Sequence, residues 1–278
     1  MSTRTTASRC RALLGVALGV TIAWPAVVAA EPPPPRDWQL SLMAYGWAPT
    51  IQADYDGTIA GQDFERTFQT DFGDVFDDWD IGAGAALNFR YMRFVMLLDG
   101  VWVQSEEDTR LQGVDLDGYV TNVVADGKIG FRVLDMPTPW AQSPTTVESP
   151  RWAIDLLAGA RYWWVRADPL DLEGKIAGPY DVQTDVDWVD PIVGGRLILE
   201  LIPQLYLSLV GDVGGFGIGN GSELTWMVHP MLNWRPFERV SFHAGYKHLR
   251  ADGRDGPSTG KSMDFELSGP MVGLGFHF

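Results

Sequence analysis

The sequence predicts an all-β fold, an antiparallel up-and-down transmembrane β-barrel of about ten strands, with roughly eight to twelve possible. From residue 80 onward, apolar and polar residues alternate with a period of two in one segment after another. Beyond the first 30 residues, no run approaches the ~18–20 consecutive apolar residues that a membrane helix requires. A chain that spans lipid without such helices must close its strands into a barrel, because every backbone polar group needs a partner there.

Residues 1–30 are typical of a secretory signal peptide. Three arginines precede an apolar core over residues 12–28, and small residues follow as far as Ala30. We expect cleavage near Ala30, so that residues 31–278 form one outer-membrane barrel domain; a membrane anchor is the alternative reading of the leader. Cleavage removes the single cysteine, Cys10, and with it any disulfide or thiolate metal site.

The chain is strongly acidic, with 36 acidic and 21 basic residues. Loss of the three leader arginines leaves 36 against 18, a net charge near −18. So acidic a surface repels nucleic acid, and we expect no nucleic-acid partner. The expected partners are outer-membrane lipids, lipopolysaccharide and the barrel-assembly machinery during insertion. We expect a monomer without a cofactor.

The first strand is predicted over residues 38–47, where Trp38, Leu40 and Leu42 share one face. Residues 51–79 then form a long acidic insertion. Within it, residues 71–79 carry apolar side chains at helical spacing between aspartates, which predicts a short amphipathic helix in the first external loop.

Nine further strands are predicted, each from period-two alternation between an apolar outward face and a polar inward face. They cover residues 80–90, 94–104, 119–133, 151–166, 188–201, 205–213, 224–235 and 240–249, and a closing strand from Met263. We expect an irregularity near Pro270, because proline cannot donate to the ladder. The even number of strands returns both termini to the periplasm.

The connections alternate in length, as in barrels with short periplasmic turns and longer external loops. Short turns are predicted at 91–93, 202–204 and 236–238, and long acidic loops at 51–79, 167–186 and 250–263. The glycine-rich segment around residues 217–219 is a tight external hairpin and not a nucleotide loop, because no helix follows it. Residues 135–150 are an exception, a long connection on the periplasmic side.

Outward-facing aromatic residues are predicted near both ends of the strands, where membrane interfaces favour indole and phenol rings. The inner group is Phe89, Phe94, Phe131, Trp152, Trp234, Phe242 and Phe278, and the outer group is Trp102, Tyr119, Trp164, Trp188, Trp226 and Tyr246. A soluble sandwich would instead concentrate its aromatics at strand centres.

The C-terminus resembles the insertion signal of bacterial outer-membrane barrels, in which a glycine precedes two alternating aromatics. Here these residues are Gly273, Phe276 and Phe278. The chain departs from that pattern at Met271, where a polar residue is usual.

Three segments carry a family resemblance: Trp188 to Arg196, Gly211 to Gly217, and Leu267 to Pro270 with the terminal strand. Over most of residues 37–278 the chain resembles a group of uncharacterised Gram-negative outer-membrane β-barrel proteins, loosely related to the OmpA/OmpW-like barrels. The shared motifs are structural, so the resemblance implies the fold and an outer-membrane location but no activity.

Inward positions of the predicted strands carry charges of both signs, and two interpretations stay open. The charges either cross-link neighbouring strands and close the interior, or they line a narrow water-filled pathway for small solutes. The predicted lumen-lining residues are Asp99, Asp126, Lys128, Arg132, Asp155, Arg161, Asp190, Arg196, Glu200, Asp212, His229, Arg235, His243 and Lys247.

Catalysis is not expected. Ser241, His229 and His243 all face inward, and His229 is predicted to lie opposite Gly245. No acid, base and nucleophile converge in this arrangement. The alternative function is an outer-membrane lipid-modifying enzyme, of the lipid A deacylase or phospholipase type, and a surface binding or adhesion barrel is a third.

Acidic residues recur in pairs in the external segments, for example Asp54/Asp56 and Asp185/Asp187. Such pairs suit Ca²⁺ or Mg²⁺, but no twelve-residue calcium loop is present, so a solvated acidic surface is favoured and no metal site is predicted.

Overall fold

The structure is a computed structural model that describes residues 37–59, 62–70, 82–111, 114–137, 151–169, 184–255 and 262–278. All of these residues belong to one compact unit, Pro35–Phe278. The predicted leader, the predicted helix at 71–79 and most of the connection at 135–150 lie outside the described residues. No helix among the described residues has the length and apolar character needed to cross a membrane.

The described residues form twelve strands. They are β1 (Trp38–Trp47), β2 (Thr50–Ile59), β3 (Gln62–Thr70), β4 (Gly82–Tyr91), β5 (Phe94–Leu111), β6 (Val114–Pro137), β7 (Arg151–Pro169), β8 (Thr184–Ile202), β9 (Leu205–Gly215), β10 (Leu224–Trp234), β11 (Val240–Asp255) and β12 (Ser262–His277).

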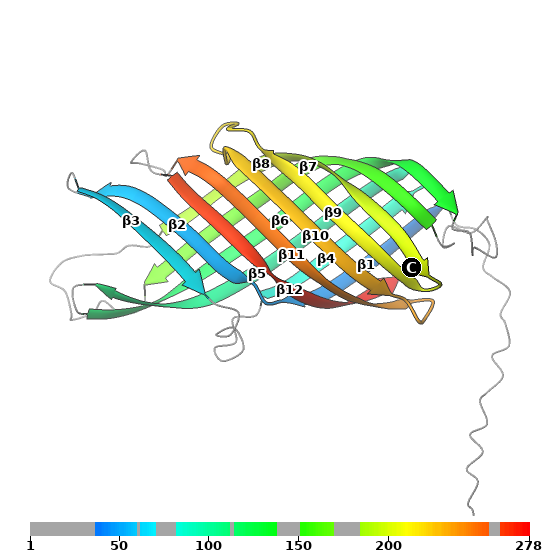
Figure 1. Cartoon of the computed structure of the whole chain (residues 1–278), viewed down its shortest axis with the longest axis horizontal. Coiled ribbons are helices and arrows are strands. Elements are labelled where there is room, and N and C mark those ends of the chain that lie inside the picture. Colours follow the sequence, from blue (N-terminus) through cyan, green and yellow to red (C-terminus); the bar gives the residue numbers. More distant parts are fainter. Residues whose placement is uncertain are drawn as a thin grey trace, which may run out of the picture. The chain divides into compact units, whose positions relative to one another are not determined.

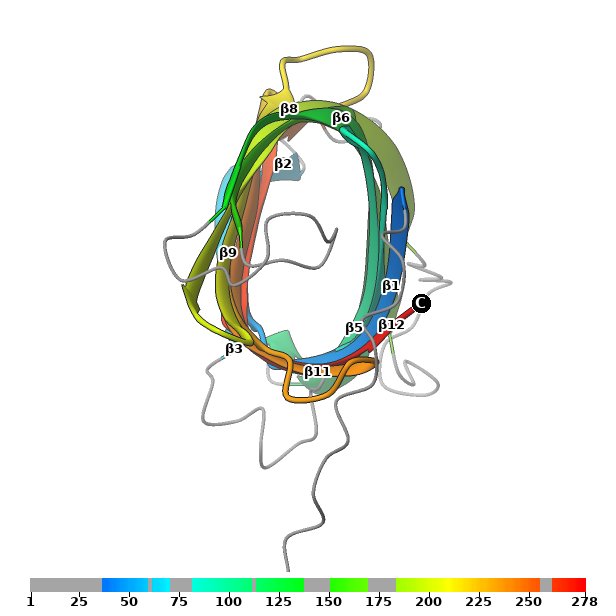
Figure 2. The ribbon, with the colours of Figure 1, turned by 90° about the vertical axis from the view of Figure 1, so that its right-hand side faces the viewer.

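Ten of these strands close into an antiparallel barrel (Figures 1 and 2). Each strand pairs with the next in the order β1, β4 to β12, and β1 also pairs with β12, which completes the ring. The prediction of an all-β, ten-stranded antiparallel barrel is therefore confirmed. We call the end where β1 begins and β12 ends the short-turn end, because the two-residue turns after Tyr91 and Ile202 lie there; the opposite end is the long-hairpin end.

The closing strand β12 has two successive partners on one side. Its C-terminal half pairs with β1, from Trp47↔Met271 onward, and its N-terminal half pairs with β2, up to Thr50↔Ser268. The interruption expected near Pro270 thus lies in the neighbouring segment at Ala48 and Pro49, while β12 itself continues through Pro270.

The expectation that residues 51–79 form an insertion without strands is wrong. Residues 50–70 form the β2–β3 hairpin, which extends the wall at the long-hairpin end (Figure 1). The reason is a short alternation within the acidic stretch, with Ile51, Ala53 and Tyr55 separated by polar residues. The hairpin β5–β6 likewise runs beyond the predicted strand ends, as far as Leu111 and Val114.

The two faces of the wall differ as the alternation predicts. Apolar side chains such as Leu156, Val193 and Val272 are exposed on the outer face, whereas charged and polar side chains such as Arg161 and Asp155 are buried on the inner face. The interior is therefore the place to search for a functional site.

Candidate functional site

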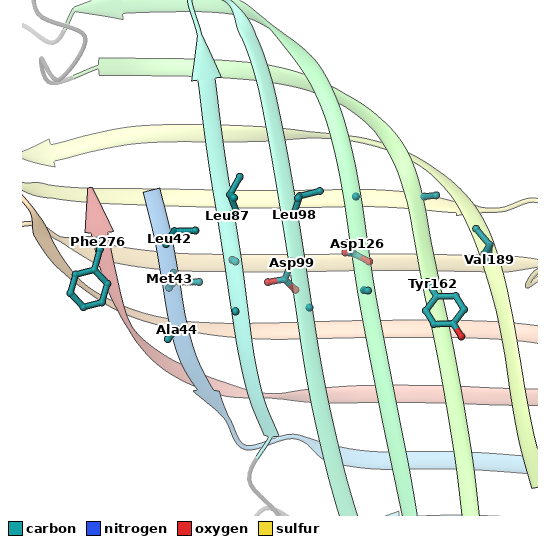
Figure 3. Close-up of a pocket in the computed structure, with 16 residues that line it drawn as sticks. Leu42, Met43, Ala44, Leu87, Leu98, Asp99, Asp126, Tyr162, Val189 and Phe276 are labelled. Carbon is teal, nitrogen blue, oxygen red and sulfur yellow. The ribbon is translucent and has the colours of Figure 1, made fainter. Parts of the chain in front are cut away.

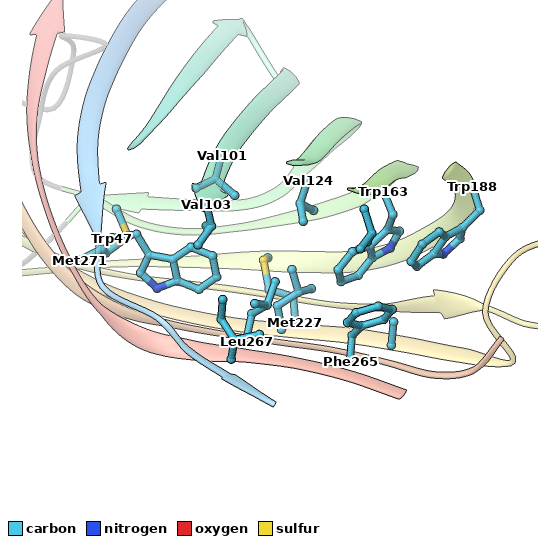
Figure 4. Close-up of a cluster of buried hydrophobic side chains, with 14 of the residues drawn as sticks. Trp47, Val101, Val103, Val124, Trp163, Trp188, Met227, Phe265, Leu267 and Met271 are labelled. Atoms are coloured by element: carbon cyan, nitrogen blue, oxygen red, sulfur yellow. The ribbon is translucent and has the colours of Figure 1, made fainter. Parts of the chain in front are cut away.

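An apolar cluster occupies the lumen on the side of the long-hairpin end (Figure 4). Its members are contributed by strands around the ring, and the largest of them, Trp47 and Trp163, are at most 1 % exposed. The buried members are Tyr45, Trp47, Ile51, Val101, Val103, Val124, Trp163, Val165, Val186, Trp188, Met227, Leu249, Ala251, Phe265, Leu267 and Met271. Water does not reach these side chains, so this level of the lumen resembles the core of a soluble protein. We call this group the lumen plug.

An aromatic stack with one carboxylate at its edge forms part of the lumen plug. Trp188 stacks on Trp163 with ring centroids 5.3 Å apart, and on Phe265 at 6.1 Å. Both indole nitrogens donate to Asp190 Oδ2, at 3.0 and 3.1 Å. The expectation that Trp188 faces the membrane is therefore wrong. Trp188 shares its strand face with Asp190, two residues on, and this parity places it inside.

Asp190 also holds the β9–β10 connection. Ser222 donates to it from its backbone nitrogen at 2.7 Å and from its hydroxyl at 2.9 Å. Four hydrogen bonds thus satisfy a carboxylate that is fully buried. The segment around residues 217–219 lies in the connection between β9 and β10, with positive φ at Gly217 and Gly219. This connection covers residues 216–223 and is longer than the tight hairpin that was expected.

A four-membered ion cluster lies next to the lumen plug. Arg161 donates to Asp126 from Nε at 2.8 Å and to Asp212 from Nη2 at 2.9 Å. Lys128 contacts the same two carboxylates, at 2.7 and 3.0 Å. These residues come from β6, β7 and β9, and Arg161 reaches a fourth strand through Thr225 Oγ1 on β10 at 3.1 Å. The side chains therefore tie together strands that are not neighbours in the wall.

Two further groups bridge the lumen. Asp155 accepts from Arg132 at 2.8 Å and from Arg196 at 2.7 Å, and Arg196 also donates to Asn88 on β4 at 3.1 Å. On another level, Lys247 on β11 pairs with Asp99 on β5, two strands on opposite sides of the ring.

The structure places the remaining predicted lumen residues as follows. Glu200 is buried on the inner face of β8, and Arg235 lies at the short-turn end, where its guanidinium donates to the Glu238 carbonyl. His229 is buried, with Nε2 2.8 Å from Met271 Sδ.

A cavity of about 310 Å³ reaches from the ion clusters to the short-turn end. Arg90, Arg235 and His277 line it at that end, and Lys128 and Lys247 line it deeper inside. Six of its eight charged lining residues are basic, although the whole chain carries a net charge of −15. Lys128, Arg132, Arg196 and Lys247 pair with carboxylates. The basic character is therefore concentrated at the short-turn end, where Arg90 and Arg235 favour a negatively charged group.

Ser241, His243, Asn233 and His277 form a hydrogen-bonded chain in the wall of this cavity. Ser241 Oγ lies 2.7 Å from His243 Nε2 and 2.8 Å from His277 Nε2. His243 Nδ1 lies 2.6 Å from Asn233 Oδ1. A hydroxyl, an imidazole and an orienting group in this sequence can activate a nucleophile.

The expected register around these residues is wrong. His243 pairs with Asn233, and Gly245 pairs with Met231 and not with His229. The β10–β11 ladder begins at Trp234↔Phe242, so Val240 and Ser241 lie before the first residue of β11 that pairs with β10. Every pair is therefore offset by two residues from the expected one. The sequence therefore did not identify Asn233 as the partner of His243, although Asn233 lies four residues from His229 and so shares its inward face.

The outer face carries a shallow apolar groove across β12, β1 and the following strands (Figure 3). Phe276, Leu42 and Leu87 lie at its β12 side, and small residues such as Ala44 and Ala85 form its floor. The predicted insertion residues Phe276 and Phe278 are exposed on this outer face. Their role in insertion stays a prediction.

No group of three or more histidine, cysteine or acidic side chains with metal-binding geometry occurs among the described residues. The acidic pairs of the external segments fall largely in residues whose side chains are not described.

No protein-family model matches the chain, and no curated protein matches it at a significant level. Three similar solved structures are the outer-membrane protease OmpT from Escherichia coli, the translocator domain of the autotransporter NalP from Neisseria meningitidis, and the attachment invasion locus protein Ail from Yersinia pestis. OmpT is 9 % identical with a TM-score of 0.53, covering 86 % of this chain and 97 % of its own. NalP is 12 % identical (TM-score 0.39, 86 % and 88 % covered), and Ail is 9 % identical (TM-score 0.34, 86 % and 99 % covered). The likeness to OmpT shows the fold, and the chain is therefore an outer-membrane-type β-barrel.

Proposed function

We propose that the protein is an outer-membrane β-barrel with a closed lumen, which acts as a structural barrel and not as a passive channel for small solutes. Its outer face supports a location in lipid, because exposed apolar side chains occur along the outward positions of the strands. Aromatic residues such as Phe94 and Trp234 at the short-turn end, and Trp102 toward the other end, suit the two membrane interfaces.

The observation that carries the proposal is side-chain contact across the lumen. Arg196 on β8 reaches Asn88 on β4, and Lys247 on β11 reaches Asp99 on β5. A hydrated bore would keep these groups apart and solvated. Beside them the lumen plug is nearly inaccessible to water, with Trp47, Leu249 and Leu267 at most 1 % exposed. Of the two interpretations of the inward charges, this arrangement favours the cross-linking network.

Planar-bilayer recording tests the proposal. Refolded protein, shown to be folded by heat-dependent mobility on a gel, should give no discrete conductance steps. A general porin reconstituted in the same lipid is the positive control. Regular unit steps from the protein itself would overturn the closed-lumen proposal. The expected partners, lipopolysaccharide among them, and the OmpA/OmpW-like relationship stay predictions.

A further inference from the structure

We propose that Ser241, His243 and Asn233 form a hydrolytic site for small, negatively charged carboxylic esters at the short-turn end of the lumen. This inference goes beyond the structural role and does not depend on whether the lumen conducts. The sequence alone did not predict that a nucleophile and a base converge. In the observed register they do, because Ser241 Oγ lies within hydrogen-bond distance of His243 Nε2.

The hydrogen bonds of Asn233 fix the orientation of its amide. Its nitrogen Nδ2 donates to the Met231 carbonyl at 3.1 Å and to Ser208 Oγ at 3.0 Å. A carbonyl only accepts, so the group facing it must be the amide nitrogen. Asn233 Oδ1 therefore faces His243 Nδ1 at 2.6 Å. Because an amide oxygen only accepts, His243 carries its proton on Nδ1.

The tautomer of His243 determines the role of the serine. With Nδ1 protonated, the neutral ring has an unprotonated Nε2, which lies 2.7 Å from Ser241 Oγ and accepts the hydroxyl proton. The hydroxyl has one hydrogen, so His277 Nε2 at 2.8 Å must be the donor to the same oxygen. Ser241 thus has a general base on one side and a hydrogen-bond donor on the other, which is the arrangement of an activated serine.

The backbone leaves room for this arrangement. Gly275 is paired with Ser241 across the β11–β12 ladder, and a Cβ atom at that position would overlap Ser241 Oγ and His243 Nε2. All four side chains also come from strands of a continuous ladder, so their positions are set by a rigid wall.

The cavity indicates the class of substrate. Its volume of about 310 Å³ is at the small end for a ligand site. Arg90, Arg196 and Arg235 line it together with apolar side chains such as Met231 and Ile198. A small acyl ester that carries a carboxylate or phosphate matches both properties. Ser241 itself is 2 % exposed and lies in the wall of this cavity.

The reaction is a double displacement at the ester carbonyl. Ser241 Oγ bonds to the carbonyl carbon as its proton passes to His243 Nε2. His277 Nε2–H, which donates to Ser241 Oγ before the reaction, shifts its hydrogen bond to the developing oxyanion. The bond to the alcohol oxygen then breaks, and the alcohol leaves with the proton from His243. Water attacks the acyl-serine in the same way, with His243 as base, and releases the carboxylic acid and free Ser241. Asn233 is a positioning residue, since it acts through His243.

Two measurements on the refolded full chain test the site. The first is hydrolysis of the p-nitrophenyl monoester of succinate, compared with neutral p-nitrophenyl acetate. The second is covalent labelling by a small fluorophosphonate, with the labelled residue identified by mass spectrometry. We expect faster turnover of the anionic ester and a label on Ser241.

Variants separate a catalytic role from a structural one. Ser241→Ala and His243→Ala should each lower kcat/KM by about 100-fold or more and abolish labelling. Asn233→Ala should lower kcat more than it raises KM, because its main effect is the loss of the hydrogen bond that orients the base His243. Ser105→Ala and His248→Ala are matched controls, since they remove a serine and a histidine that do not line the cavity and do not contact Ser241. Both should retain activity and labelling.

The proposal fails if Ser241→Ala, folded by gel mobility, hydrolyses the ester as fast as the unmodified protein. It also fails if the label lies on another residue, or if the unmodified protein neither hydrolyses the ester nor takes the label. None of these results would affect the closed-lumen proposal, which is decided by conductance.

Discussion

Arg196 on β8 donates from Nη1 to Asn88 Oδ1 on β4 at 3.1 Å, although three strands separate them on one side of the ring and five on the other. At the same time Arg196 pairs with Asp155 at 2.7 Å. One arginine therefore joins nearly opposite parts of the wall. Contacts of this kind make the interior a structural element of the barrel, because opening the lumen would leave several buried charges without partners.

Removal of Arg161 should destabilise the barrel strongly. Arg161 is fully buried and contacts both Asp126 and Asp212, so Arg161→Ala leaves two buried carboxylates with only Lys128 between them. Loss of one partner from a buried ion pair costs roughly 3–5 kcal/mol. Urea unfolding of the protein in lipid vesicles measures this loss. Arg250→Ala, which removes partly exposed pairs with Asp252 and Glu266, should cost about 1 kcal/mol or less. Equal losses in the two variants would contradict the cluster's role.

Truncation of the lumen plug should make the barrel permeable. The double change Trp47→Ala and Trp163→Ala removes two large side chains that are at most 1 % exposed. We expect faster swelling of liposomes in a small sugar, and a loss of stability of roughly 3–5 kcal/mol for each substitution. Trp102→Ala is the matched control, because Trp102 is 42 % exposed on the outer face. If liposomes that contain the control and liposomes that contain the double variant swell at the same rate, the plug is not the permeability barrier.

Gly159 should be intolerant of a side chain. A Cβ atom there would overlap the carbonyl oxygen of Gly127 on the neighbouring strand β6, and a backbone atom cannot rotate away. We therefore expect Gly159→Ala to reduce the fraction of protein that reaches the heat-modifiable folded form. Gly100→Ala has open space around the new methyl group and should assemble normally. Normal assembly of both variants would show that the strands separate more easily than the structure implies.

Loss of Asp190 should release the β9–β10 connection. Ser222 and the indoles of Trp163 and Trp188 all donate to this carboxylate. Without it the connection loses two hydrogen bonds to a charged group, each worth about 1.5–3 kcal/mol. Chymotrypsin should then cut after the exposed Phe216 at least about tenfold faster in Asp190→Ala, since about 1.4 kcal/mol corresponds to tenfold. Asp185→Ala, which removes an acceptor for the outward Trp164, should be cut at the original rate.

The strand positions and faces could be predicted because a lipid-facing wall requires strict alternation. For β7 the alternation of Trp152, Ile154 and Leu156 with Asp155 indicates both the strand and its inner face. The ends of the strands are harder to predict, because beyond the membrane the outer face no longer needs apolar residues. This is why β5 and β6 extend well past the predicted limits.

The lumen plug was not predicted, although a signal for it exists. At the far end of β7 both faces are apolar: Trp163 and Val165 lie inside the barrel, while Tyr162 and Trp164 lie outside. Trp188 on β8 was expected to face the membrane because it lies near a strand end, but it is the residue that stacks on Trp163 inside the barrel. A residue two positions from a charged inward residue lies on the same face of the strand. This spacing is the safer guide to which face an aromatic residue occupies, since it depends on strand geometry alone.

The constellation around Ser241 could not be predicted because it depends on register. Alternation specifies the face of each strand but not how far it slides along its neighbour. The length of the connection after Trp234 decides whether His243 meets Asn233 or another residue. The partner on β12, His277, depends in addition on a strand far from β10 in sequence.

The lumen plug lies on one side of the ion clusters only, and this asymmetry determines from which end a ligand can reach the cavity. Among the described residues, the cavity extends to the short-turn end, and the lumen plug, with its tryptophan and leucine side chains, closes the lumen toward the long-hairpin end. A ligand of the cavity lined by Arg90 and Arg235 would therefore enter and leave at the short-turn end. The cavity is then accessible from one side of the membrane alone. A reagent too large to cross the bilayer would reach the cavity when added on that side and not when added on the other.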